Sequence, residues 1–203
     1  VPRFYEKLLA DVSSDGLVEA LGGNMVWAMS GGAPLPLAVI DAYHTAGVTL
    51  LQGYGLTEAS PIVSADTPGT LDITTVGPPL ANVETRLTDE GELLVRGPSV
   101  MAGYWQQPDA TAAVLRDGWL ATGDRAEFTS AGNLRILGRL RDTIVLSTGR
   151  KVEPSAIEGV LLAEPSIEQV IVGGSGTASL CALIVPRWSV VREALGHTEP
   201  VAV

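Results

Sequence analysis

The chain has 203 residues, 46% of them hydrophobic, so it is long and apolar enough to bury a sizeable core. Its 13 basic and 23 acidic residues give a formal net charge of −10, which disfavours binding to nucleic acid. No apolar run approaches the roughly 18 residues that a membrane span needs. Composition therefore predicts a globular protein and excludes fibrous, disordered and membrane-spanning classes.

The N-terminal third has the pattern of an α/β fold. Apolar residues at helical spacing predict a helix over residues 3–12, and short apolar runs at 25–29 and 48–52 predict buried strands. Between these strands, a helix is predicted over residues 36–46, with Pro at its start and Gly directly after its end. Strand, helix and strand in this order form one βαβ unit, so we expect a parallel sheet.

Each of these strands runs into glycines. Gly31 and Gly32 follow the first strand, and Gly53 and Gly55 flank Tyr54 after the second. We expect both segments to form turns at the carboxyl edge of the sheet, where open α/β folds place ligands. Glycine lets a backbone approach a flat ring or a phosphate closely. Taken alone, however, Gly31-Gly32 is more typical of an ordinary turn.

Thr57 and Glu58 come shortly after the second glycine segment. A hydroxyl beside a carboxylate supplies the hard oxygen ligands that Mg²⁺ takes alongside phosphates, and Tyr54 offers a flat face for stacking. An acidic residue at a helix N-terminus would explain the same pair. The pattern alone leaves both interpretations open.

Beyond residue 69 the pattern changes to short alternating runs separated by turn residues. Two hairpins are predicted, one over residues 83–95 and one over residues 128–137, and together they indicate a small β-barrel-like unit. Asp124 is predicted to end an apolar strand, where its carboxylate could accept hydrogen bonds from two ribose hydroxyls. A turn that happens to carry an Asp is the commoner explanation of such a residue.

The pattern changes again after residue 138. A charged stretch contains Arg139 and Asp142, which could be no more than a solvated turn, and a helix is predicted to begin at Pro154. Two strands follow, over 169–172 and 180–185.

Cys181 is the chain's single cysteine and lies within the last of these apolar runs. It cannot form an intrachain disulfide, and the pattern favours a small buried hydrophobe in a reducing compartment over a nucleophile. We therefore expect a cytoplasmic protein.

Four stretches occur in an order that resembles the AMP-forming acyl-CoA synthetases of the adenylate-forming superfamily. They are S-G-G-A-P-L from Ser30, Q-G-Y-G-L-T-E from Gln52, G-W-L-A-T-G-D from Gly118, and G-R-L-R-D-T-I from Gly138, which runs on to S-T-G-R-K-V-E-P. The last stretch and the opening V-P-R-F-Y-E-K look most similar to long-chain fatty acid–CoA ligases. The resemblance covers nearly the whole chain.

The resemblance implies an α/β fold in three parts. Residues 1–69 would be part of the α/β nucleotide-binding subdomain of a large N-terminal domain, and residues 70–138 its β-barrel-like subdomain. Residues 139–203 would be the hinge and the start of a small α+β C-terminal domain. The family's phosphate loop and its C-terminal adenylation lysine have no match here, so we expect an incomplete member.

The resemblance also implies the roles of individual residues. The adenine pocket and its surroundings would be formed by Gly31, Gly32, Ala33, Gly53, Tyr54 and Gly55. Thr57 and Glu58 would be catalytic, holding the ATP phosphates, with Glu58 also binding Mg²⁺. Asp124 and Arg139 would bind the ribose hydroxyls. Asp142 would be the hinge about which the C-terminal domain rotates, and Gly149 would line the channel for the pantetheine arm of coenzyme A.

The implied activity is ATP- and Mg²⁺-dependent conversion of a fatty acid to acyl-AMP, followed by transfer of the acyl group to coenzyme A. Two alternatives stay open: adenylation of a different acid, such as an aryl or amino acid, and a non-catalytic nucleotide-binding or interaction remnant. Apolar surface left uncovered in an incomplete chain would favour self-association, and peripheral contact with a membrane is compatible with a fatty acid substrate.

Overall fold

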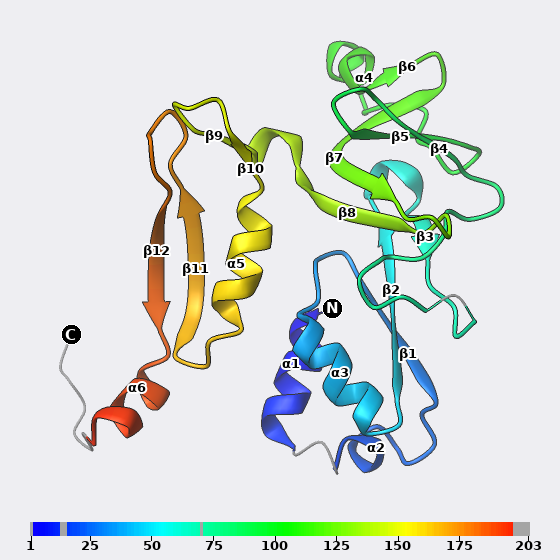
Figure 1. Ribbon diagram of the computed structural model, residues 1–203. Helices are drawn as coiled ribbons and strands as arrows, with labels where there is room; N and C mark the ends of the chain where they lie inside the picture. The colour runs from blue at the N-terminus through cyan, green and yellow to red at the C-terminus, as the bar shows by residue number, and fades with distance from the viewer. Residues whose placement is uncertain (1, 13–15, 70, 197–203) are drawn as a thin grey trace. The chain divides into compact units, whose positions relative to one another are not determined.

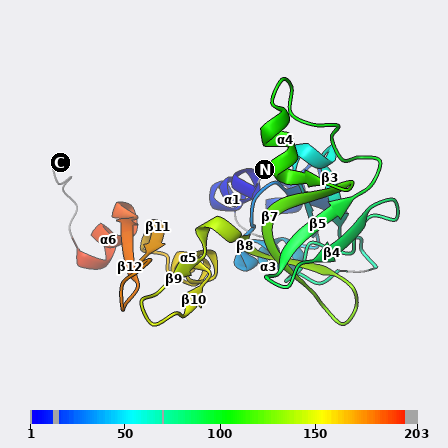
Figure 2. The same cartoon turned by 90° about the horizontal axis from the view of Figure 1, so that it is seen from above.

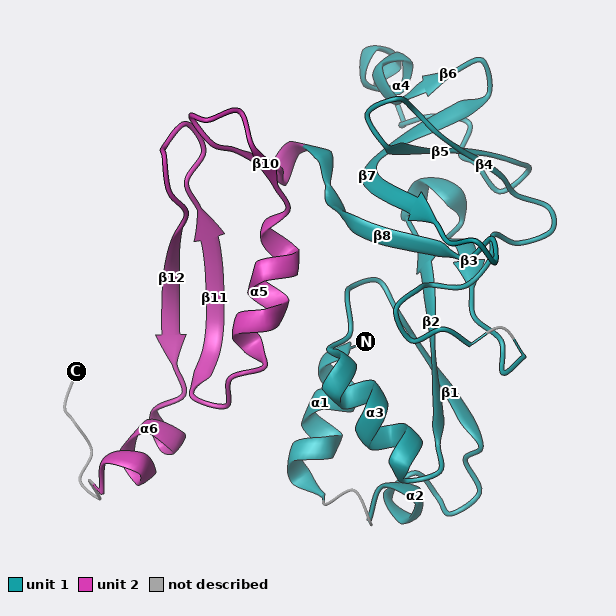
Figure 3. Cartoon of the chain, in the orientation of Figure 1, with its two compact units in different colours: residues 1–140 teal, residues 141–203 magenta. Residues whose placement is uncertain are grey.

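The computed structural model describes residues 2–12, 16–69 and 71–196. The chain divides into two compact units, Val1–Leu140 and Arg141–Val203, which are coloured separately in Figure 3 and are described one at a time. In the described part of the chain, no helix is both long enough and apolar enough to cross a bilayer. The three-part division of the chain stays a prediction.

The first unit opens with the parallel βαβ arrangement that the sequence predicts. Strands β1 (Trp27–Gly31) and β2 (Thr49–Gly55) run parallel, with Trp27 opposite Thr49 and Gly31 opposite Gly53, and helix α3 (Leu37–Thr45) connects them (Figure 1). A third strand, β3 (Ile62–Ala65), pairs antiparallel with β2. The predicted parallel sheet is therefore confirmed, with an antiparallel strand added at one edge.

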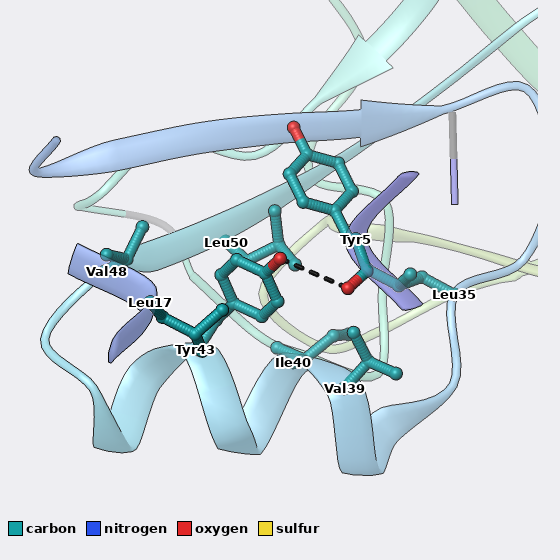
Figure 4. Close-up of a cluster of buried hydrophobic side chains, with 8 residues drawn as sticks. All are labelled: Tyr5, Leu17, Leu35, Val39, Ile40, Tyr43, Val48 and Leu50. Atoms are coloured by element: carbon teal, nitrogen blue, oxygen red, sulfur yellow. Dashed lines mark hydrogen bonds between the residues drawn. The ribbon is translucent and has the colours of Figure 1, made fainter. Parts of the chain in front are cut away.

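Two further helices, α1 (Pro2–Asp11) and α2 (Leu17–Ala20), complete the first hydrophobic core. In Figure 4 the aromatic rings of Tyr5 and Tyr43 lie in this core, with centroids 5.5 Å apart and nearly perpendicular planes. The Tyr43 hydroxyl donates to the Tyr5 carbonyl at 3.1 Å, and the Tyr5 hydroxyl donates to the Met29 carbonyl at 2.8 Å. These two bonds connect α3 to α1 and α1 to the middle of β1. The cluster consists of Tyr5, Leu17, Leu35, Val39, Ile40, Tyr43, Val48 and Leu50.

The rest of the first unit is a five-stranded antiparallel sheet. Its strands are β4 (Glu84–Leu87), β5 (Glu92–Arg96), β6 (Leu115–Arg116), β7 (Trp119–Phe128) and β8 (Leu134–Arg139), with helix α4 (Pro108–Val114) before β6. The order is β4-β5-β7-β6, with β8 paired to β7, and β7 bends along its length (Figure 2). The β4–β5 and β7–β8 pairs confirm both predicted hairpins.

A second hydrophobic core lies under this sheet, and it also takes residues from outside the sheet. Ala59 and Val63, which precede the predicted boundary at residue 69, are fully buried in it. They pack with side chains of the five-stranded sheet, among them Leu93, Val95 and Leu120. The segment that follows β2 is therefore held by the core of the antiparallel sheet.

Two local predictions are wrong. Gly53, Tyr54 and Gly55 do not form a turn, because β2 continues through them and pairs with β3. Asp124 does not end its strand, since β7 continues to Phe128 and pairs with β8. In both places the strand is prolonged by pairing with a segment further along the chain.

The second unit has the predicted α+β composition. After a 3₁₀ turn (Leu140–Asp142) come β9 (Ile144–Val145), β10 (Lys151–Val152), α5 (Pro154–Leu162), β11 (Ile167–Gly173), β12 (Cys181–Pro186) and α6 (Trp188–Leu195). Strands β11 and β12 pair antiparallel, and Glu158 of α5 accepts a hydrogen bond from the Val172 backbone at 2.8 Å. Cys181 is exposed rather than buried, because β12 is exposed from Cys181 to Val185.

Candidate functional site

The two glycine segments lie side by side in the first unit. Gly31 ends β1 directly opposite Gly53 of β2, and a Cβ at Gly31 would lie 3.0 Å from the Gly53 carbonyl oxygen. Gly32 has φ +83°, and it is exposed together with Ala33. Gly32 and Ala33 are therefore open to solvent beside β2, and a side chain at Gly31 would be in tight contact with the backbone of β2.

Gly55 is required by the path of the chain beyond β2. The chain makes a 3₁₀ turn over Thr57–Ala59, passes through Ser60 in the left-handed region at φ 52°, and returns as β3. A Cβ at Gly55 would lie 1.7 Å from the Pro61 carbonyl oxygen. This tight reversal places Thr57 and Glu58 directly beside the end of β2.

Tyr54, Asp124 and Arg139 come together from three strands. The Tyr54 hydroxyl donates to one carboxylate oxygen of Asp124, Oδ2, at 2.5 Å. Arg139 Nε lies 3.0 Å from the other oxygen, Oδ1, and Arg139 Nη1 donates to the Thr122 carbonyl at 3.1 Å. These residues are 70 and 85 positions away from Tyr54 in the chain, yet their side chains form one connected cluster.

The Asp124 carboxylate is held in a fixed orientation by its two partners. Asp124 is only 5% exposed, and a buried carboxylate is costly unless it is paired and hydrogen-bonded. The guanidinium of Arg139 and the phenol of Tyr54 supply that compensation. Burial, together with the hydrogen bond to the Asp124 carboxylate, raises the pKa of Tyr54 well above its usual value, so the phenol stays a donor at all physiological pH values.

A carboxylate has about four lone-pair positions, so the two bonds from Tyr54 and Arg139 leave Asp124 able to accept further hydrogen bonds. Arg139 is about half exposed at its side chain, so one side of the ion pair faces solvent. The pair can therefore receive a ligand that presents two adjacent hydroxyl groups, such as a ribose. The role of Asp124 and Arg139 in binding the ribose stays a prediction.

Thr57 and Glu58 are placed differently from each other. Thr57 is exposed, whereas Glu58 is half-buried and accepts a hydrogen bond from the Tyr104 hydroxyl at Oε1, 2.8 Å away. This bond is the main reason that the pKa of Tyr104 lies above its usual value. The Glu58 carbonyl also accepts from the Met101 backbone at 2.8 Å, so both ends of the residue are held.

The oxygen atoms of Thr57 and Glu58 could bind Mg²⁺ only if a phosphate supplied further ligands. Within the described residues, no group of three or more His, Cys, Asp or Glu side chains could cage a metal ion. Nucleotide-bound Mg²⁺ typically takes one or two carboxylates and completes its shell with phosphate oxygens and water. Glu58 with its second oxygen, Oε2, and the exposed Thr57 hydroxyl suit that kind of site.

The two remaining predicted residues belong to the second unit. Asp142 closes the 3₁₀ turn at the start of that unit and lies 3.6 Å from Arg141 as an exposed ion pair. Gly149 has φ +81° in the exposed turn between β9 and β10, where its N–H donates to the Leu146 carbonyl at 2.8 Å. No atom lies close to the place of a Cβ at Gly149. Glycine is therefore favoured here by the positive φ and not by steric crowding.

Sequence reasoning missed three residues that hold the site. Tyr104, Thr122 and Glu92 each bond a predicted residue or the backbone beside one. Thr122 could have been noticed, since it stands two positions before Asp124 where a hydroxyl often bonds the following backbone. Tyr104 and Glu92 carry no such local signal, because their partners are 46 and 31 positions away.

Comparison with known proteins shows which class of enzymes this chain resembles. The structure is similar to that of O-succinylbenzoate coenzyme A synthetase (MenE) from Bacillus subtilis in complex with ATP and a magnesium ion, with a TM-score of 0.73 and 27% identity. The match covers 84% of this chain and 40% of that one. The predicted fold class, part of an adenylate-forming enzyme, is thereby confirmed.

The chain belongs to the AMP-binding enzyme family, whose profile matches residues 1–105, while the profile of the AMP-binding enzyme C-terminal domain matches residues 141–199. It is 43% identical over 165 residues to long-chain-fatty-acid–CoA ligase FadD15 of Mycobacterium bovis, a match that covers 81% of this chain and 28% of the relative. It is 38% identical over 183 residues to long-chain-fatty-acid–CoA ligase of Escherichia coli O157:H7, covering 81% and 32%. The chain thus spans about a third or less of these relatives.

Proposed function

We propose that this chain is the nucleotide-binding part of an enzyme that converts a fatty acid and ATP to acyl-AMP and then transfers the acyl group to coenzyme A. The observation that carries the proposal is the buried carboxylate of Asp124, which is held by Tyr54 and by the half-exposed guanidinium of Arg139. The names of the curated relatives support a long-chain fatty acid as the substrate.

In this proposal each group of the first unit binds one part of the nucleotide. Asp124 and Arg139 take the ribose hydroxyls, and the backbone of residues 31–33 lies with Tyr54 around the adenine. Thr57 and Glu58 face the phosphates, where Glu58 holds Mg²⁺. Mg²⁺ would supply positive charge to offset the charge that develops on the α-phosphate as a carboxylate attacks it.

For the second unit we propose a hinge at Asp142 and a pantetheine-lining role for Gly149. The hinge is supported by position, since Asp142 is the second residue after the boundary between the two units. Rotation at such a point lets one active site run two successive reactions by presenting different loops. Gly149 is suited to close approach of a ligand because no neighbouring atom occupies the place of a Cβ.

The location and the partners are also proposals. A cytoplasmic enzyme that uses small-molecule substrates is supported by the acidic composition and by the single cysteine. Peripheral contact with a membrane would suit a lipid substrate. A different acid remains the second candidate for the substrate, because the similar B. subtilis enzyme is named for O-succinylbenzoate.

Calorimetric titration with AMP and with a non-hydrolysable acyl-AMP analogue tests the nucleotide site. We expect the wild-type chain to bind both, and Asp124→Ala to weaken binding about 10- to 100-fold, since hydrogen bonds to a charged group contribute roughly 1.5–3 kcal/mol. Asp41→Ala, which removes an exposed carboxylate from α3, is the matched control and should bind as the wild type does. A folded wild-type chain that binds neither ligand would contradict the proposal and favour a non-catalytic remnant.

The substrate is tested separately in the full-length protein. Pyrophosphate release across a panel of long-chain, aryl and amino acids should be fastest with long-chain fatty acids. Faster pyrophosphate release with an aryl or amino acid would contradict the fatty acid as substrate. It would leave the proposed nucleotide site unchanged.

A further inference from the structure

Strand β7 contains a bulge that ends at Asp124. Between two regular pairs of β5 and β7, a single residue of β5, Leu93, faces three residues of β7: Thr122, Gly123 and Asp124. The regular pairs on either side are Leu94 with Ala121 and Glu92 with Arg125. Bulges redirect side chains and leave backbone groups without their ladder partners, so something else has to satisfy those groups.

Two side chains take the place of the missing ladder bonds. The Glu92 carboxylate accepts the Gly123 N–H at 2.9 Å. The Thr122 hydroxyl accepts the Asp124 N–H at 3.1 Å and donates to the Leu93 carbonyl at 2.8 Å. Thr122 is buried, so its hydroxyl would be costly there without these partners. Gly123 sits at φ +71°, a conformation that other residues rarely adopt.

The bulge also fixes the cation that pairs with Asp124. The Thr122 carbonyl accepts a hydrogen bond from Arg139 Nη1, and the same guanidinium pairs with Asp124 through Nε. In the β7–β8 ladder Asp124 stands directly opposite Arg139. The backbone of residues 122–124 therefore sets the positions of both the carboxylate and the guanidinium.

We propose that Glu92 and Thr122 are positioning residues: they hold the β7 bulge in the form that aims Asp124 and Arg139 at the ribose of the nucleotide. The inference rests on the proposed function, because it assigns these two side chains to the same nucleotide site. Neither needs to touch the nucleotide. Glu92 acts by accepting the Gly123 N–H, and Thr122 by accepting the Asp124 N–H and donating to the Leu93 carbonyl. At residue 92 the inference requires a hydrogen-bond acceptor and not a charge.

Amide hydrogen exchange tests the bulge without any nucleotide. Glu92→Ala should speed exchange of the Gly123 N–H by about tenfold or more, and Thr122→Val should do the same for the Asp124 N–H, because each loses its acceptor. Glu92→Gln keeps an acceptor oxygen and should preserve protection. Glu90→Ala, an exposed carboxylate two positions away in the hairpin turn, is the matched control. Unchanged exchange at Gly123 in Glu92→Ala would overturn the inference.

AMP titration then tests the consequence for the ligand. We expect Glu92→Ala and Thr122→Val to raise the Kd for AMP about tenfold, and Glu92→Gln, Thr122→Ser and Glu90→Ala to stay within about threefold of the wild type. A purely structural role would lower thermal stability without this split between the conservative and the truncating variants. Wild-type affinity in Glu92→Ala, or equal losses in Glu92→Gln and Glu92→Ala, would overturn the inference.

The two proposals fail in different ways. A wild-type chain that binds no AMP contradicts the proposed function, and amide exchange still decides whether Glu92 and Thr122 hold the bulge. A wild-type chain that binds AMP, with all variants binding equally well, leaves the proposed function standing and removes the positioning role.

Discussion

Asp66 is a buried carboxyl that the proposed chemistry does not use. It follows β3 and is 2% exposed. Burial, with a smaller contribution from the nearby carboxylate of Asp72, raises the pKa of Asp66 to about 6. The folded chain therefore holds a proton on Asp66 at pH values where the unfolded chain has lost it.

This shift predicts a pH dependence of stability with a definite sign. Between pH 4 and about 6 the folded state binds more protons at Asp66 than the unfolded state does, so the free energy of unfolding falls as the pH rises. The loss should amount to about 2–3 kcal/mol and level off above pH 6 to 7. Asp66→Asn should remove it, so the difference in unfolding free energy between variant and wild type should grow by that amount from pH 4 to pH 7 in urea titrations.

A difference that stays constant across this range would show that Asp66 titrates normally in the folded chain. Taking the difference between variant and wild type matters because other carboxyls act in the opposite direction. Hydrogen bonds from Thr74, for example, lower the pKa of Asp72.

At the scale of single residues, the sequence motifs predicted candidate site residues but not the side chains that hold them in place. Asp124 and Glu58 stand in short local patterns, and patterns of that kind are visible in a single sequence. Glu92 and Tyr104 act through bonds that depend on strand register and on chain reversal. No local feature of the sequence encodes those distances, so only the folded chain shows them.

At the scale of elements, Gly55 decides whether β2 can pair with β3. A Cβ there would lie 1.7 Å from the Pro61 carbonyl oxygen, and that oxygen belongs to the backbone, so it cannot rotate away. We expect Gly55→Ala to lower the free energy of unfolding by about 3 kcal/mol or more, because the reversal over residues 56–61 would have to open. Thermal or urea unfolding of purified protein measures this.

Gly69→Ala is the matched control for that variant. Gly69 is exposed, and the nearest atom to its Cβ position is a side-chain oxygen 4.0 Å away. The control should therefore change stability by less than about 1 kcal/mol. If Gly55→Ala were equally mild, the tight reversal after β2 would not exist in solution.

Most helices and strands could be predicted from the sequence. The wrong predictions arose where the outcome depends on contacts with distant parts of the chain. The βαβ unit and both hairpins follow from local periodicity and turn residues, and they are confirmed. The glycines at 53 and 55 resemble a turn, yet they continue a strand because β3 returns to pair with them. The burial of Cys181 was wrong because an apolar run says nothing about whether a partner covers it.

At the scale of the whole molecule, the apolar surface of the second unit predicts self-association. Ile171 and Leu183 stand directly opposite each other on β11 and β12, and they are 66% and 71% exposed. A two-stranded sheet with exposed edges and apolar side chains is prone to pair with another copy. We expect sedimentation equilibrium at micromolar concentrations to show dimers or larger species.

The double variant Ile171→Glu with Leu183→Lys should shift the chain toward monomer, while the opposite charges keep the strand pair compatible. Val26→Lys is the control, because it places a charge on a residue of the first unit that is 70% exposed. Association that persists in the double variant, or that Val26→Lys abolishes, would place the contact elsewhere.

The burial of Ala59 and Val63 beneath the antiparallel sheet has a consequence for protein engineering. A chimera that exchanged only residues 70–138 with a relative would set foreign side chains against these two, and a mismatch of a single methylene in a packed core costs about 1 kcal/mol. The Thr57–Ala59 turn would be strained by the same mismatch, since Ala59 is part of both. A crossover placed before Leu56 would instead exchange the turn together with the sheet residues that pack against it.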